Sequence, residues 1–141
     1  MAGYSQTPLV KKLGLKEGAN ACILNPPAKY FDWITPLPEG AVIKPALRSN
    51  VDFIHFFVTK QPEFRTALIR AKKHLQPDGM IWVSWPKKTS GVLSDLDENI
   101  IREFGLKSGL VDVKVCAVDD IWSGLKFVIP VKDRPKAIKR P

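Results

Sequence analysis

The sequence predicts one α/β domain, with helices on both faces of a mostly parallel sheet and an antiparallel C-terminal strand. Three observations predict this fold. Short apolar runs alternate with amphipathic stretches along the 141 residues, an order typical of strands joined by crossover helices. The run at residues 51–58 is almost continuously apolar, which indicates a strand buried on both faces. The last two apolar runs are too close together for a crossover, so we expect them to pair antiparallel.

The first half of the chain predicts short elements. Thr7 is a good N-cap and Pro8 fits the first helical position, so a short amphipathic helix begins there and ends at Gly14. Three further short elements follow along the chain: a strand at 19–24, a helix at 27–34 and a brief strand at 41–43. Two prolines and Gly40 mark the loop before the last of these.

A long helix is the clearest element of the second half. It opens at Gln61 and Pro62, where proline suits the first turn. Its apolar side chains recur at the spacing of one helical face, namely Phe64, Ala67, Leu68, Ala71 and Leu75. A turn at 77–79 and a strand at 80–84 follow.

Another helix and two strands complete the domain. Ser94 and Asp97 resemble a capping box at the start of the helix. Glu98 and Arg102 are spaced to form an ion pair on its surface. The two strands are expected at 111–118 and 122–131.

The composition indicates a globular protein with an apolar core, since 45% of residues are hydrophobic and 26% are charged. No apolar run approaches the roughly 20 residues that span a bilayer, and the first residues lack a secretion signal. We therefore expect a cytoplasmic protein without a membrane partner. Cys22 and Cys116 lie in separate apolar runs, without a paired-cysteine or cysteine–histidine motif. Both are expected to be buried and reduced, and no metal site is expected.

The formal net charge of +8 is distributed unevenly. A domain at 1–131 is followed by a basic tail at 132–141, which holds five basic side chains and one acidic side chain. A basic surface attracts nucleic acid or acidic metabolites, whereas a solvated basic tail also aids solubility. Both alternatives stay open, because no nucleic-acid-binding motif accompanies the charge.

Two resemblances narrow the fold. The order of elements resembles the second half of Rossmann-like, S-adenosylmethionine-dependent methyltransferases, and residues 51–54 and 71–81 carry the resemblance. The second segment is similar to the leucine-x-proline-x-glycine turn before the fifth strand of those enzymes. The chain also resembles, over nearly its full length, a family of small bacterial proteins catalogued only as a domain of unknown function. The segments that carry this second resemblance are 3–5, 7–9, 12–14, 82–88, 95–96, 98–99 and 115–119. The first resemblance implies a methyltransferase-like fold, and the second implies no activity.

Three departures from the methyltransferases predict a truncated Rossmann-like fold. Their first strand is followed by a glycine-rich loop, whereas an Asn-Pro-Pro sequence at 25–27 stands here and its prolines lack backbone N–H groups. Their second strand ends in an acidic residue, and here Lys44 follows the strand. The 26 residues at 25–50 are too few for two strand–helix units. We therefore expect no cofactor, and S-adenosylmethionine in particular is not expected.

The loops after three parallel strands should meet at the carboxyl edge of the sheet, where ligands of open α/β sheets bind. The loop after the strand at 80–84 is the richest in groups that hold an anion, because two lysines precede a helix start beside Trp85. We hypothesise a pocket for an anionic ligand there; the alternative is that Trp85 packs in the core and the lysines face water. The candidate residues are Asn25, Pro26, Thr59, Lys60, Ser84, Trp85, Pro86, Lys87, Lys88, Ser90 and Asn99. No catalytic residue is assigned, and His55 and His74 are expected to be structural.

The sequence leaves three functions open. The main expectation is a binding protein, non-catalytic or at most weakly catalytic, for a small anionic ligand or a protein partner, and not an enzyme. The first alternative is a divergent S-adenosylmethionine-dependent methyltransferase, which rests on the resemblance of the fold. The second alternative is a nucleic-acid-binding protein, which rests on the net charge of +8.

Overall fold

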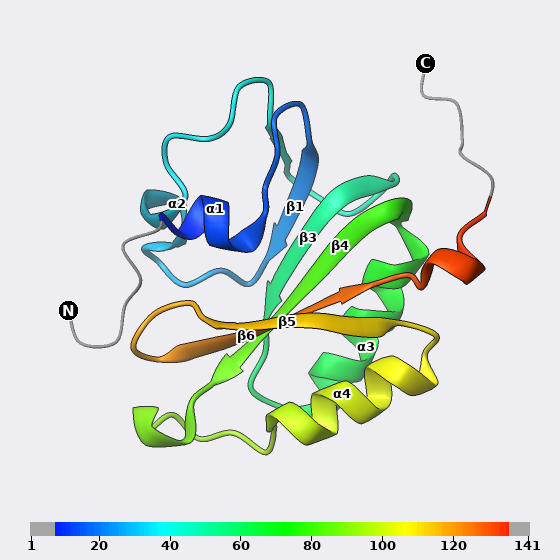
Figure 1. Ribbon diagram of the computed structural model, residues 1–141. Coiled ribbons are helices and arrows are strands. Elements are labelled where there is room, and N and C mark those ends of the chain that lie inside the picture. The colour runs from blue at the N-terminus through cyan, green and yellow to red at the C-terminus, as the bar shows by residue number, and fades with distance from the viewer. Residues whose placement is uncertain (1–7, 136–141) are drawn as a thin grey trace.

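The computed structural model describes residues 8–135 as a six-stranded sheet between two layers of helices (Figure 1). Its elements are α1 (Leu9–Leu13), β1 (Asn20–Leu24), α2 (Tyr30–Trp33), β2 (Val42–Lys44), β3 (Val51–Phe57), α3 (Gln61–Lys73), β4 (Leu75–Pro86), η1 (Lys88–Ser90), α4 (Glu98–Lys107), β5 (Val111–Ala117), β6 (Trp122–Val128) and η2 (Val131–Asp133). Within this part of the chain, no helix is long and apolar enough to cross a bilayer.

The sheet confirms the expected fold class. Its strand order is β2-β1-β3-β4-β6-β5, with parallel pairing from β2 to β4. β6 pairs antiparallel with both β4 and β5. α3 and α4 cover one face, and α1 and α2 cover the other (Figure 1). The parallel strands end at one edge of the sheet, which therefore collects the loops that follow them.

The α3/α4 face carries the larger part of the apolar core. The fully buried residues of α3 are Phe64, Leu68 and Ala71, all on the face that the sequence predicted. Phe64 packs edge-on against Phe104 of α4, with ring centroids 5.5 Å apart. Gly105 lets α4 approach β6 closely, because a Cβ atom there would lie 2.2 Å from the Phe127 ring. Burial of this layer is the main contribution that holds both helices on the sheet.

Short helices cover the other face, and hydrogen bonds hold them there. Trp82 of β4 is fully buried, and its Nε1–H donates to the Leu13 carbonyl at the end of α1 (2.7 Å). α2, expected over 27–34, spans four residues and buries Tyr30 against the Phe57 ring. Helices of this length do not form on their own in water. The tertiary contacts of their side chains therefore stabilise them.

β4 begins earlier than the sequence predicted. It starts at Leu75 and runs through the segment expected to be a turn at 77–79. The ladder shifts between Val51 and Phe53, so the four residues 76–79 lie opposite a single residue of β3. The expected turn is thus a bulge within a continuous strand.

α4 begins later than predicted. Asp97 is its N-cap and accepts the Ile100 N–H at 2.9 Å, so the helix starts at Glu98. Ser94 does not form the expected capping box. Its hydroxyl donates to the Thr59 carbonyl (2.6 Å) and so fastens the loop before α4 to the end of β3.

Both ends of the domain differ from the expectation. Pro8 is the N-cap of α1 rather than its first helical residue, and Thr7 lies outside the described residues. β6 ends at Val128, short of the expected end at residue 131, and Val131–Asp133 form η2. The basic tail is described only as far as residue 135, and its separation from the domain stays a prediction.

The two cysteines are free thiols, as expected. Cys22 is buried in β1, whereas Cys116, which was expected to be buried, is half-buried in the edge strand β5. Three strands lie between β1 and β5 in the sheet. The two thiols therefore cannot meet in the folded protein.

Candidate functional site

The carboxyl edge of the sheet holds the residues singled out above. β1 ends at Leu24, β3 at Phe57 and β4 at Pro86, and these strands are parallel. After β1 the chain moves outward to β2, and it then returns to β3 on the other side of β1. In open α/β sheets, this reversal of strand order opens a crevice where ligands bind.

A groove of about 510 Å³ lies at the reversal, and we call it the switch-point groove. Its lining residues are Leu24, Asn25, Val58, Pro62, Glu63, Thr66, Ala67 and Arg70. The strand ends supply apolar surface, and the exposed Glu63 and Arg70 of α3 supply one charge of each sign. The Arg70 guanidinium also donates to the Leu47 carbonyl at 3.4 Å, which holds it beside the groove.

Asn25 makes the turn out of β1 without a glycine. Its φ of 55° lies in the left-handed region, and no other non-glycine residue between 8 and 135 has a positive φ. Asparagine adopts this conformation more readily than most residues that carry a side chain. The backbone turn that a glycine would provide is therefore present, although the two prolines after Asn25 still lack N–H donors.

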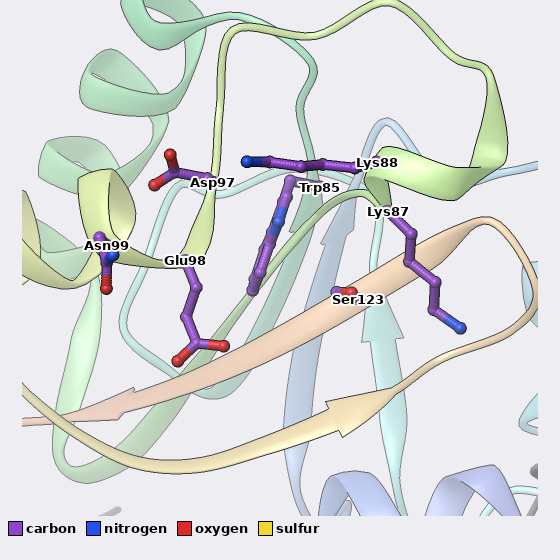
Figure 2. Close-up of a pocket in the computed structure, with 7 residues that line it drawn as sticks. All are labelled: Trp85, Lys87, Lys88, Asp97, Glu98, Asn99 and Ser123. Carbon is purple, nitrogen blue, oxygen red and sulfur yellow. The ribbon is translucent and has the colours of Figure 1, made fainter.

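A second hollow, of about 350 Å³, lies at the end of β4, and we call it the β4 hollow (Figure 2). Its lining residues are Trp85, Lys87, Lys88, Asp97, Glu98, Asn99 and Ser123. Figure 2 shows the Lys88 ammonium group reaching toward Asp97, whereas Lys87 extends away from both. The Trp85 ring stands beside these groups and is only 6% exposed. The hollow thus presents charges of both signs around the edge of an aromatic ring.

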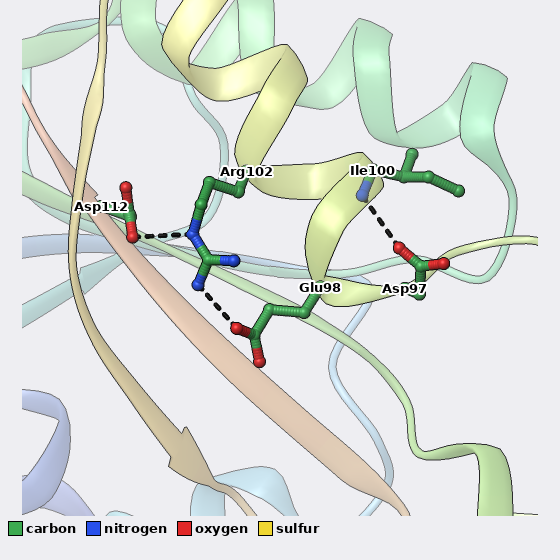
Figure 3. A network of polar contacts seen from close by, with 5 residues as sticks. All are labelled: Asp97, Glu98, Ile100, Arg102 and Asp112. Carbon is green, nitrogen blue, oxygen red and sulfur yellow. Dashed lines mark hydrogen bonds and ion pairs between the residues drawn. The ribbon is translucent and has the colours of Figure 1, made fainter.

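A hydrogen-bonded network fixes the acidic side of the β4 hollow (Figure 3). Arg102 donates to Glu98 at 2.6 Å, as the spacing predicted, and to Asp112 at 2.9 Å. The bonds to Glu98 and Asp112 raise the pKa of Arg102. The lining residues therefore carry two positive and two negative side chains, and Arg102 pairs with one of the negative ones, Glu98. Within residues 8–135, no three His, Cys, Asp or Glu side chains gather to hold a metal ion.

The structure divides the single pocket that the sequence predicted. Asn25 lines the switch-point groove, whereas Trp85, Lys87, Lys88 and Asn99 line the β4 hollow. The alternative for Trp85 also holds in part, because its ring packs in the core of the α3/α4 face. The two sites are neighbours along one edge of the sheet, since they lie at the ends of adjacent strands.

The remaining candidates line neither of these two hollows: Pro26, Thr59, Lys60, Ser84, Pro86 and Ser90. Ser84 is fully buried on the α1/α2 face. Thr59 uses its carbonyl to accept bonds from the loop before α4. Ser90 Oγ accepts the Val92 N–H at 3.1 Å and so closes a local turn. These residues were predicted from topology alone, which gives the edge on which a residue lies but not the direction of its side chain.

A buried polar chain crosses the α1/α2 face, and no motif in the sequence predicted it. The Tyr30 hydroxyl lies 2.9 Å from His55 Nδ1, and His55 Nε2 lies 2.8 Å from Ser84 Oγ. All three residues are fully buried. Burial lowers the pKa of His55 to about 3 and raises the pKa of Tyr30, so both side chains are neutral. The sequence pattern placed His55 in a strand. It did not show that Tyr30 is the partner of His55, because this contact depends on how α2 packs.

The comparison with solved structures finds this fold in methyltransferases. A SAM-dependent methyltransferase from Aquifex aeolicus is similar with a TM-score of 0.64 and 13% identity, over 86% of this chain and 88% of that one. The DhpI–SAH complex has a TM-score of 0.61 and 9% identity, over 87% and 83%. Magnesium protoporphyrin IX methyltransferase (ChlM) from Synechocystis PCC 6803 with bound SAM has a TM-score of 0.56 and 10% identity, over 86% of this chain and 74% of that one. No protein-family model matches the chain, and no curated protein does.

At these identities the likeness shows the fold, which confirms the resemblance to a methyltransferase-like Rossmann fold. The resemblance to a bacterial family of unknown function stays a prediction. The order of strands also explains why the chain looked truncated. Relative to the full Rossmann order, the missing strand would lie beyond β2 at the edge of the sheet.

Three expectations are wrong in the light of this comparison: a non-catalytic binding protein, no enzyme activity and no cofactor. The structures that share the fold are methyltransferases or complexes with SAM or SAH, which favours the alternative of a divergent methyltransferase. The physical reason for the error is the place of the truncation. It removes an outer part of the sheet, whereas the crevice between β1 and β3 is retained.

Proposed function

We propose that the protein is a divergent S-adenosylmethionine-dependent methyltransferase that holds its methyl donor in the switch-point groove. The observation that carries the proposal is the position of this groove, at the reversal of strand order in a sheet of methyltransferase type. Ligands of open α/β sheets bind at this position. The volume of about 510 Å³ also falls in the usual range of small-molecule sites.

The groove residues fit the chemical groups of S-adenosylmethionine. Leu24, Val58 and Ala67 offer apolar surface for the adenine ring. Arg70 can pair with the carboxylate of the amino-acid end, and Glu63 can pair with its ammonium group or accept from ribose hydroxyls. When bound, the cofactor supplies a methyl group on a positively charged sulfur. The residues of the groove bind and orient it, and no residue is assigned to proton transfer.

The β4 hollow is the proposed site of the methyl acceptor. Val58 of the groove donates its N–H to the Ser84 carbonyl at 3.0 Å, and Trp85 of the hollow is the next residue of β4. Donor and acceptor sites therefore lie on adjacent strands. Lys87 and Lys88 favour an acceptor with negative charge, and the edge of Trp85 favours an apolar or aromatic part beside it.

Calorimetric titration with S-adenosylhomocysteine, the demethylated form of the donor, tests the cofactor site. The unaltered protein is expected to bind it. Thr66→Trp is expected to weaken binding by about tenfold or more, because Thr66 is exposed in the groove and an indole ring there occupies its volume.

Arg65→Trp is the matched control, since Arg65 is exposed on the same helix but does not line the groove. It is expected to bind as the unaltered protein does. Absence of binding heat at millimolar ligand would overturn the proposal. An equal loss of affinity in both variants would also overturn it, because it would show that binding does not depend on the groove.

A further inference from the structure

Four lysines gather on the α1/α2 face, on the opposite side of the sheet from α3 and the switch-point groove. Lys12 lies at the end of α1 and Lys16 follows it, while Lys114 and Lys126 lie on the paired strands β5 and β6. We call these four residues the lysine patch. Lys16 and Lys114 are exposed, and Lys12 and Lys126 are half-buried. Solvent therefore reaches all four side chains.

Two of these lysines face each other across the β5–β6 ladder. Lys114 and Lys126 are register partners in an antiparallel pair. Like charges directly opposite each other destabilise a sheet. Burial lowers the pKa of Lys126, and repulsion from Lys114 and Lys16 lowers it further. Folding thus brings these cations together against their mutual repulsion.

Direct contacts hold three of the four ammonium groups of the patch in place. Lys12 Nζ donates to the Ala117 carbonyl at 3.1 Å, and Lys114 Nζ donates to the Lys12 carbonyl at 3.1 Å. Lys126 Nζ lies 5.8 Å from the centroid of the Trp82 ring, within the range of cation–π attraction. Because an ammonium group has three N–H donors, each keeps capacity for another acceptor. Lys12, Lys114 and Lys126 are therefore a preorganised set of cations.

The positive charge is centred on β5 and β6. Lys16 also lines a hollow of about 180 Å³ with Glu17, Asp52 and Asp78, so the charge is mixed at that end. The other three lysines interact electrostatically with the Cys116 thiol. Burial raises the pKa of this thiol, and the three lysines partly offset the increase. A partner that gains from the patch must therefore carry negative charge over β5 and β6.

We propose that the lysine patch binds the phosphate backbone of a nucleic acid, without regard to base sequence. A row of phosphates contacts several ammonium groups at once and releases counterions. Lysine acts as a point charge on phosphate, whereas base recognition often uses the planar guanidinium of arginine. The aromatic ring under Lys126 belongs to Trp82, which is fully buried and so cannot stack on a base. The patch acts independently of the proposed cofactor site, since the two lie on opposite faces.

Fluorescence anisotropy with labelled DNA of about 20 nucleotides, single-stranded and duplex, tests the proposal. The unaltered protein is expected to bind both, with an affinity that falls steeply with salt. The double variant Lys114→Gln, Lys126→Gln is expected to reduce the slope of log affinity against log salt by about 1.8 for duplex DNA. Its melting temperature is expected to be unchanged or raised, because the substitution removes a like-charge pair.

Two control variants separate position from net charge. Lys107→Gln with Lys132→Gln removes the same charge from exposed sites on α4 and η2, and is expected to keep the salt slope. The double variant Lys114→Arg, Lys126→Arg retains the charge and is expected to retain binding. Equal losses in the two glutamine variants would overturn the proposal.

Two further measurements identify the source of the phosphate. If inorganic phosphate displaces DNA at equal phosphate concentration, the proposal that the partner is a nucleic-acid polymer is overturned. Binding to phosphatidylserine vesicles without binding to DNA would overturn it as well. Thr66→Trp is expected to bind DNA as the unaltered protein does, so failure of the cofactor site and failure of the patch remain distinguishable.

Discussion

The two faces of the sheet are held in different ways. Helices of 13 and 10 residues cover the α3/α4 face with continuous apolar stripes. Helices of five and four residues cover the α1/α2 face, where aromatic rings surround buried hydrogen bonds. Trp82 bonds to the end of α1, and Tyr30 of α2 begins the chain through His55 to Ser84.

The difference shows that a short helix needs specific polar contacts where a long helix needs only an apolar face. A helix of four residues presents one turn to the sheet, which buries too little surface to hold it by burial alone. Polar contacts bring a sensitivity that an apolar layer lacks, because they depend on protonation. The two faces should therefore respond differently to loss of apolar surface and to acid.

The largest effect is expected from Phe64→Ala on the α3/α4 face. Phe64 is fully buried and packs against Phe104, so its removal leaves a cavity between the two long helices. We expect a loss of about 3–5 kcal/mol in the free energy of unfolding, measured in urea. Ile69→Ala on the exposed side of α3 is the control, with an expected change of about 0.5 kcal/mol or less. Similar losses in both variants would mean that α3 is not held by its apolar stripe.

Acid is expected to act through the α1/α2 face. The pKa of His55 is about 3 in the folded protein, below its usual value of 6.5. Below pH 6.5 the unfolded chain therefore binds a proton that the folded protein excludes. The stability that comes from neutral His55 is present above pH 6.5 and is lost as the pH falls toward 3, by about 1.4 kcal/mol per pH unit.

Urea unfolding at several pH values checks this expectation. His55→Gln should be less stable at neutral pH, because it disturbs the bonds to Tyr30 and Ser84, but should lose less stability on acidification. Ile69→Ala, on the exposed side of α3, carries no titratable group, is the control and should keep the original dependence on pH. An unchanged dependence in His55→Gln would refute the assignment.

The smallest effect is expected from Asp97→Ala. This variant removes a polar contact from the α3/α4 face, which is held mainly by apolar burial. Loss of the bond from the Ile100 N–H should cost about 1 kcal/mol in unfolding free energy. Amide exchange should increase in the first turn of α4 and not in α3. Glu103→Ala, exposed within the same helix, should leave both quantities unchanged; a loss equal to that of Asp97→Ala would argue against a capping role.

The sequence predicted α3 more accurately than α4. The apolar spacing from Phe64 to Ala71 predicted both the start and the buried face of α3. The start of α4 was predicted too early, because Ser94 and Asp97 are both good caps. Ser94 instead bonds to Thr59, a residue distant in the sequence. The spacing of residues along the chain does not show whether a side chain will bond to a nearby backbone group or to a residue distant in the sequence.

The candidate site was predicted as an edge but not as a shape. Parallel pairing brought the ends of β1, β3 and β4 together, as expected. The loop before α4 then binds the end of β3 and the start of α3, where Asp95 accepts the Gln61 N–H at 2.8 Å. The cofactor expectation failed for a different reason. Besides the truncation, it depended on glycine content, whereas Asn25 adopts the left-handed turn without glycine.

The placement of the two thiols allows chemical labelling to distinguish local from complete unfolding. Cys116 lies half-buried in the edge strand β5, and Cys22 is buried in β1, with three strands between them. Burial raises the pKa of both, so alkylation is slow until solvent reaches them. Fraying of the edge strand should therefore add one label, at Cys116, while complete unfolding should add two. The mass of the alkylated chain would then distinguish a frayed molecule from an unfolded one.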